Sequence, residues 1–102
     1  MENQLFCDIY NDSAFKKKAE AMLQIIYKRN KPTFDDDATD LDDFVQEMWC
    51  QLFEEKTFCP DRAWCFEAIR HNAIDYVRVI QNRLGIAEHV VYDEDECYYE
   101  MA

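Results

Sequence analysis

The chain has 102 residues, 49% of them hydrophobic and 15% aromatic, which is enough to bury the core of one domain. Eleven basic against 22 acidic side chains give a net charge of -11, which argues against a free-standing nucleic-acid-binding protein, because such proteins neutralise phosphates with an excess of cations. A single glycine and two prolines favour an all-α helical bundle, and the short apolar runs exclude a membrane span of roughly 20 residues.

The cysteines are odd in number, their spacing suggests no disulfide framework, and no apolar leader segment precedes them. A set of this kind predicts a reduced, cytoplasmic protein. The five are Cys7, Cys50, Cys59, Cys65 and Cys97.

Residues 1–12 are mixed in composition, and we interpret them as an N-terminal extension of a helical domain that spans 13–84. Asp12 or Ser13 can cap a first helix, which we expect to stop at Pro32. Its apolar positions at helical spacing are Phe15, Ala19, Met22, Leu23, Ile26 and Tyr27. The only dense positive charge of the chain lies here, in Lys16, Lys17, Lys18, Lys28, Arg29 and Lys31. Lysines on an exposed helix face are usually solvated.

Residues 33–43 are rich in aspartate, and a run of like charges predicts a loop. Thr39 or Asp40 is the expected N-cap of the next helix. The run lacks the glycine at position six and the glutamate at position twelve of a calcium-binding loop, so we expect no metal site there.

A second helix is expected from Leu41 to near Lys56, because apolar residues recur three and four positions apart. They are Leu41, Phe44, Val45, Met48, Trp49, Leu52 and Phe53. The opposite face carries Asp42, Asp43, Gln46, Glu47, Gln51, Glu54 and Glu55. Periodicity alone indicates an ordinary amphipathic helix with a solvated acidic side.

Residues 57–61 form a connector, after which a long helix begins at Pro60 or Asp61 and ends at Asn82 or Arg83, with Gly85 as a left-handed cap. Its expected core positions are Phe66, Ile69, Ala73, Tyr76, Val77 and Ile80. The side chains expected to face elsewhere are Glu67, Arg70, His71, Asp75, Arg78, Gln81 and Asn82. Residues 85–102 hold six acids and no lysine or arginine, which predicts an acidic tail that is either unattached or docked on a basic surface.

Neither catalysis nor metal binding is expected, so we predict that the chain is not an enzyme and uses no cofactor. Cys59, Cys65 and His71 stand six residues apart, which is too wide for the close pair that zinc sites favour. His71 and Asp75 share a helix face, but neither a serine or cysteine nucleophile nor a glycine-rich phosphate loop accompanies them. The aromatic residues around the connector are expected in the core, and an exposed subset could stack on unpaired bases.

Two segments together resemble a known family. The stretch D-F-V-Q-E-M-W-C-Q-L-F, from Asp43 to Phe53, resembles the D-L-V-Q-E-x-F-L-x-x-W signature of region 2.2 in sigma-70-family transcription factors, closest to the extracytoplasmic-function type. The later stretch R-A-W-C-F-E-A-I-R-H-N-A-I-D-Y-V-R resembles the family's R-A-W-L-x-x-I-A-R-N-x-A-I-D-Y-L-R pattern. The resemblance covers residues 12–83 and implies a small helical bundle like sigma factor region 2.

The resemblance implies that the chain binds the RNA polymerase core at the clamp of its largest subunit, and promoter DNA within that complex. The implied polymerase contacts are Asp43, Gln46 and Glu47. The implied contacts to the promoter -10 element are Arg62, Trp64, Arg70, His71, Asn72 and Arg78. An acidic protein suits a basic clamp, because opposite charges steer association and strengthen hydrogen bonds.

The chain departs from the family pattern in several ways, among them the inverted order of Ala68 and Ile69. His71 stands where the family has an asparagine, and only Arg83 continues the family's arginine run. The second, -35-reading domain has no counterpart, so a split sigma subunit with a separate sigma-like partner, or a phage or mobile-element factor, is the leading expectation, and an anti-sigma factor is a further candidate partner. The alternatives are an acidic sigma mimic that inhibits transcription and a helical protein-interaction adaptor.

Overall fold

The computed structural model describes residues 3–55 and 61–85, which form five α-helices and no strand. The helices are α1 (Asn3–Tyr10), α2 (Ser13–Arg29), α3 (Lys31–Asp36), α4 (Leu41–Phe53) and α5 (Arg62–Leu84). The predicted all-α class is therefore confirmed over the described part of the chain. The predicted connector at 57–61, except Asp61, and the acidic tail after Gly85 lie outside the described residues, as do Cys59, His89 and Cys97.

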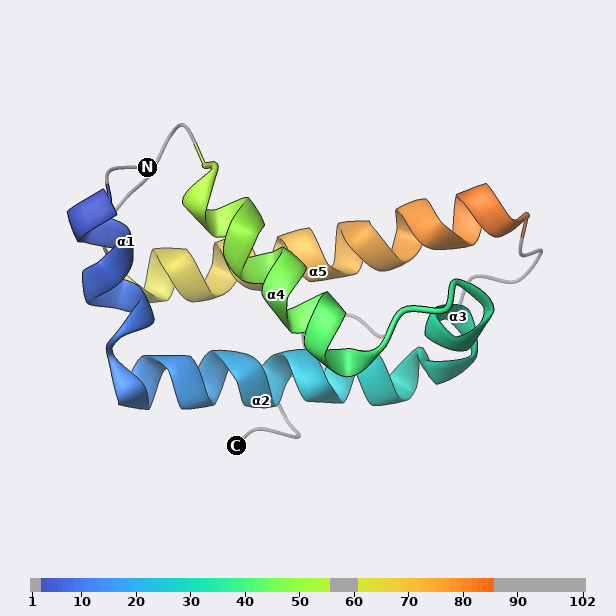
Figure 1. Cartoon of the computed structure of the whole chain (residues 1–102), viewed down its shortest axis with the longest axis horizontal. Helices are drawn as coiled ribbons and strands as arrows, with labels where there is room; N and C mark the ends of the chain where they lie inside the picture. Colours follow the sequence, from blue (N-terminus) through green and yellow to red (C-terminus); the bar gives the residue numbers. More distant parts are fainter. Residues whose placement is uncertain (1–2, 56–60, 86–102) are drawn as a thin grey trace.

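The two longest helices, α2 and α5, pack against each other, and α4 packs on both (Figure 1). The short helices close the two ends of this layer: α1 packs on α2 at one end, and α3 packs on α2 and α5 at the other. None of the described helices combines the length and apolar character needed to cross a membrane.

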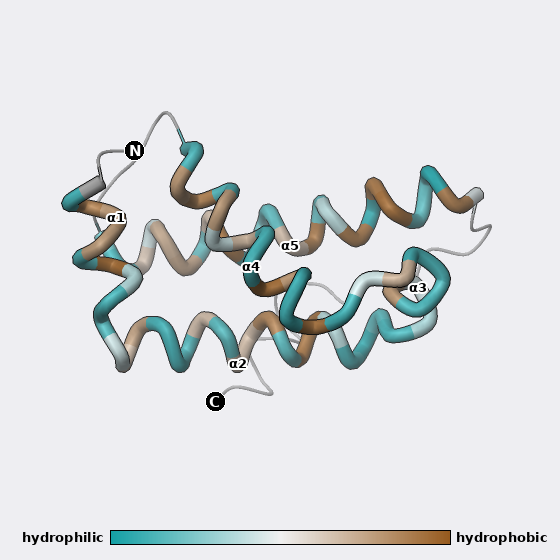
Figure 2. The backbone as a smooth tube through the Cα atoms, viewed as in Figure 1, coloured by the Kyte–Doolittle hydropathy of each residue, from teal (hydrophilic) through white to brown (hydrophobic). Residues whose placement is uncertain are grey.

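Apolar side chains from all five helices form one core. Figure 2 shows that hydrophobic and hydrophilic residues alternate along α2, α4 and α5, as expected for amphipathic helices. All six apolar positions predicted for the first helix are buried. A chain of aromatic rings joins the elements, since Phe34 of α3 lies 4.7 Å from both Tyr27 of α2 and Phe44 of α4. Phe44 in turn lies 5.9 Å from Tyr76 of α5, measured between ring centroids.

Each of the three long helices is capped at its N-terminus by an aspartate side chain, and each of these aspartates was a predicted candidate for that position. The carboxylate of Asp12 accepts a hydrogen bond from the Phe15 backbone N–H at 3.1 Å. Asp40 accepts from the Asp43 N–H at 2.8 Å. Asp61 accepts from the Ala63 N–H of α5 at 2.7 Å.

Both ends of the bundle contain a short helix that the sequence analysis did not predict. The N-terminal extension contains α1, because Ile9 is fully buried and Phe6 and Tyr10 pack against the core. The loop expected for the aspartate-rich segment is wrong up to Asp36, which is helical, whereas α2 ends at Arg29, before Pro32, as expected. Pro32 itself lies in the first turn of α3. Proline is tolerated there because the first turn of a helix has no intrahelical partner for its N–H groups.

The second helix is shorter than expected, since α4 ends at Phe53 and not near Lys56. Phe53 is also 39% exposed, whereas the periodicity placed it in the core. In α5 the error is the reverse, because Arg70 and Gln81 are buried although both were expected to face elsewhere. Gln81 donates a hydrogen bond to the Thr33 hydroxyl of α3 at 3.3 Å, so a helix absent from the sequence-based prediction provides its partner.

Gly85 ends α5 in the left-handed conformation, with φ of 71°. The predicted cap is confirmed, and nothing lies within 4 Å of where a Cβ atom would stand. Replacing Gly85 with alanine should therefore cost only the backbone strain, about 1 kcal/mol in the free energy of unfolding. Urea denaturation followed by circular dichroism measures this loss, and an unchanged midpoint would show that the cap does not stabilise α5.

Candidate functional site

The polar side of α4 presents the three predicted polymerase contacts. Asp43, Gln46 and Glu47 all have exposed side chains, while Phe44 and Met48 of the same motif are fully buried. Burial of the apolar half fixes the helix against α2 and α5, and the polar half is thereby held outward on a rigid element. The amphipathic division that the sequence predicts for this motif is confirmed for these five residues.

The three contacts lie within an arc of about 100° around the helix axis, with Asp43 between Gln46 and Glu47. Asp43 and Glu47 are one turn apart and lie on the side of α4 that faces Tyr76 of α5. Burial raises the pKa of Tyr76 above its ordinary value, and the carboxylate of Glu47 adds to this rise, with smaller contributions from Asp37 and Asp43. The positive charge of Arg83 acts in the opposite direction and lowers this pKa.

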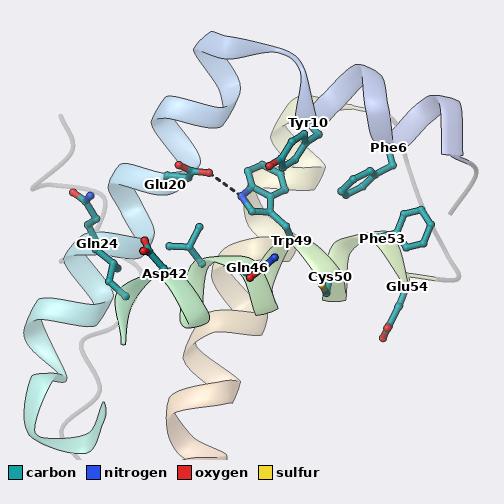
Figure 3. A pocket seen from close by; sticks show the side chains of 12 residues that line it. Phe6, Tyr10, Glu20, Gln24, Asp42, Gln46, Trp49, Cys50, Phe53 and Glu54 are labelled. Atoms are coloured by element: carbon teal, nitrogen blue, oxygen red, sulfur yellow. Dashed lines mark hydrogen bonds between the residues drawn. The ribbon is translucent and has the colours of Figure 1, made fainter. Parts of the chain in front are cut away.

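Gln46, at the other edge of this arc, lines a groove of about 640 Å³ that opens between α1, α2 and α4 (Figure 3). Its floor is apolar and aromatic, with ring centroids 5.1 Å apart for Phe6 and Phe53 and 5.2 Å apart for Tyr10 and Trp49. Its polar rim comprises Glu20, Gln24, Asp42, Gln46 and Glu54.

Trp49 links the floor of the groove to its rim. The indole N–H donates a hydrogen bond to the Glu20 carboxylate of α2 at 3.0 Å, which satisfies the one polar atom of a largely buried side chain. The groove was not predicted, because α1 forms one of its walls. The signal was present in Phe6 and Tyr10, whose four-residue spacing with Ile9 between them is helical.

The predicted DNA contacts on α5 are divided among three places. Counting about 100° per residue, Trp64, His71 and Arg78 share one side of the helix. His71 and Arg78 are exposed, whereas Trp64 is half-buried and packs against the core. Arg62 lies at the start of the helix, and Asn72 is half-buried on its flank.

Arg70 lies on the buried side of α5 and not with the other predicted contacts. Its side chain is 7% exposed and forms an ion pair with Glu67 one turn earlier. The expectation that Arg70 belongs to the polar side is thus wrong, because its position is about 100° from His71 and adjoins the core positions. The sequence order of an R-H-N triplet could not show which member turns inward.

Three further basic groups of α5, Arg62, Arg83 and His71, also lie beside carboxylates. Arg62 bonds to Asp12 at 3.2 Å, and this contact, after the stronger effect of the Phe15 N–H, lowers the pKa of Asp12. Arg83 forms an ion pair with Asp37. The imidazole of His71 lies 3.9 Å from Glu67, the residue that also pairs with Arg70. Much of the positive charge of α5 is therefore offset within the bundle.

Metal-ligating side chains do not gather within the described ranges, where no group of three or more His, Cys, Asp or Glu residues could hold an ion. Cys65 is buried, and Cys7 and Cys50 are exposed on different helices. Comparison of the chain with protein-family models, with curated proteins and with solved structures finds no match.

Proposed function

We propose that the chain is a docking module for RNA polymerase, which binds the clamp of the largest subunit through the outward polar side of α4. The observation that carries the proposal is the exposure of Asp43, Gln46 and Glu47 on a helix whose apolar half is fixed in the core. The backbone of a preformed helix loses little entropy on binding, and its exposed carboxylates attract the basic groups of a partner. The motif resemblance names that partner.

As a sigma-like factor, the docked chain contributes to promoter -10 recognition and DNA opening, and it performs no catalysis of its own. The side of α5 that carries Trp64, His71 and Arg78 supports this role with one half-buried aromatic ring and two exposed groups able to donate hydrogen bonds. DNA is then held within the polymerase complex, since a protein of net charge -11 gains little from phosphates alone.

A second candidate function is inhibition, in which the chain occupies the clamp without opening DNA. The pairing of Arg62 with Asp12, Arg70 with Glu67 and Arg83 with Asp37 favours it, because these arginines are already engaged with carboxylates of the chain. Transcription in vitro with core polymerase separates the two functions. A sigma-like factor adds a new start site, whereas an inhibitor only lowers the transcripts that depend on another sigma factor.

Co-purification with core polymerase tests the docking step that both functions share. The full chain should retain the polymerase on an affinity resin, and the triple variant Asp43→Ala, Gln46→Ala, Glu47→Ala should lose most of this binding, because it removes two charges and one amide from the docking side. Failure of the full chain to retain polymerase, or retention equal to that of the triple variant, would contradict the proposal.

A further inference from the structure

The groove between α1, α2 and α4 combines exposed apolar surface with acidic charge (Figure 3). Phe53 is 39% exposed at one end of it, and Phe6, Tyr10 and Val45 are half-buried along it. Apolar surface of this kind costs free energy while it faces water, and a partner that covers it recovers that cost. The proposed polymerase contacts share only Gln46 with the groove, so the groove can serve a separate partner.

The groove is elongated along α4. Its lining extends from Leu41, the first residue of that helix, to Phe53, the last, and includes Glu54 beyond it. At 1.5 Å per residue, the distance from Leu41 to Phe53 is about 18 Å. An α-helix of roughly three turns has this length, and its residues at i, i+3, i+4 and i+7 can lay apolar side chains into such a groove. The shape therefore favours a helical segment over a compact small molecule.

The rim of the groove is acidic. Asp42 and Glu54 lie near the two ends of α4, and Glu20 of α2 lies along one side (Figure 3). None of the described residues that line the groove is basic. Asp42 and Glu54 are exposed, and within the described part of the chain neither forms an ion pair. Their charges can therefore attract the basic side chains of a partner.

One cation of the chain lies near the rim and offsets part of its charge. The Lys16 ammonium lies 3.8 Å from the centroid of the Tyr10 ring. A hydrogen bond with Tyr10 raises the pKa of Lys16, and the charge of Glu20 adds to this rise. Since Lys16 thus attends to Glu20, the two acids at the ends of α4 supply most of the negative charge that a partner meets.

We propose that the groove binds an amphipathic α-helix of another protein, whose apolar side chains cover the aromatic floor and whose flanking Lys or Arg residues pair with Asp42 and Glu54. A second copy of this chain fits poorly, because each copy carries a net charge of -11 and like charges repel. An apolar helix without basic flanks leaves both acids unmatched. The inference goes beyond the proposed function, and its test contains no polymerase, so either can fail alone.

Synthetic helical peptides of about 14 residues test the proposal, with leucines along one face and arginine, glutamine or glutamate at the flanking positions. Fluorescence anisotropy of each labelled peptide measures its affinity for the full chain. The arginine peptide should bind at least about fivefold more tightly than the glutamine peptide, and the glutamate peptide should bind most weakly. Equal affinities would show that charge does not select the partner, and they would overturn the proposal. The absence of arginine-peptide binding at about 1 mM would also overturn it.

A pair of double variants tests whether the peptide binds at the rim. Asp42→Asn with Glu54→Gln keeps the shape of the rim but removes two charges, and it should weaken binding of the arginine peptide about fivefold. Asp36→Asn with Asp75→Asn removes two exposed acids that do not line the groove, and it should change the affinity less than about twofold. Equal losses in both variants would mean that net charge alone attracts the peptide, which would overturn the proposal.

Two exposed cysteines locate the bound peptide without any substitution. Cys50 lines the groove, whereas Cys7 does not. At a concentration of about twice its Kd, the arginine peptide should slow alkylation of Cys50 by iodoacetamide about threefold and leave Cys7 unaffected, as mass spectrometry of the digested chain measures. Equal protection of both thiols, or of neither, would overturn the proposal. Protection of Cys50 that grows with the concentration of the chain alone would assign the groove to a second copy and would also overturn it.

Discussion

Replacement of Phe44 with alanine should lower the free energy of unfolding by about 3–5 kcal/mol. The Phe44 side chain is fully buried, and its ring lies near Tyr27, Phe34 and Tyr76, which belong to three other helices. The cavity left by alanine would therefore separate α4 from α2, α3 and α5 together. Urea denaturation followed by circular dichroism measures the loss.

The matched control is Phe53→Ala in the same helix. Phe53 is 39% exposed and contacts Phe6 edge-on, so its truncation should cost about 1 kcal/mol. If the two variants lost equal stability, the two phenylalanines would be buried to the same degree, which would contradict the described packing of α4. The comparison separates the core position from the groove position within one motif.

The second large effect concerns binding. Reversal of charge in the double variant Asp43→Lys, Glu47→Lys should weaken the affinity for core polymerase at least about 100-fold, because close charge pairs at an interface contribute about 1.5 kcal/mol or more each and become repulsive. Fluorescence titration of a labelled chain with core polymerase measures the change. Since Asp43 lies in the first turn of α4, circular dichroism of the variant checks that helix content is kept.

The control for this variant reverses the same number of charges elsewhere. Asp36 and Asp75 are exposed acids on α3 and α5, and Asp36→Lys with Asp75→Lys gives an identical net charge. We expect its affinity to stay within about threefold of the unmodified chain, because distant exposed charges are screened. Comparable losses in both double variants would mean that only the overall charge attracts the polymerase, with no specific role for α4.

The long helices could be predicted because their signals are local. Apolar residues at helical spacing define α2, α4 and α5, and Asp12, Asp40 and Gly85 mark their ends with side-chain or backbone chemistry that needs no tertiary context. The local signals of the short helices are weaker, and for α1 they consist of the helical spacing of Phe6, Ile9 and Tyr10. A helix as short as α1 or α3 is unstable alone, and packing against the bundle supplies most of its stability.

The burial of two polar side chains of α5 also could not be predicted from the sequence. Gln81 is 1% exposed because α3 brings Thr33 beside it, and Arg70 is 6% exposed beside Glu67. The burial of Gln81 depends on a contact between two helices. The burial of Arg70 depends on its position on α5, about 100° around the helix axis from His71. Exposure of Asp43 and Glu47 was predictable from the same helical wheel, whereas the groove beside Gln46 required α1. The partner itself was named only by the resemblance of the motif.

Site-specific photo-crosslinking tests the central claim most directly. A photoreactive amino acid in place of Glu47, in the full chain bound to core polymerase, should crosslink to the clamp of the largest subunit. The same group in place of Asp75 on α5 is the matched comparison and should give no crosslink to the clamp. A crosslink from position 47 to any other subunit, or equal crosslinking from both positions, would contradict docking through α4.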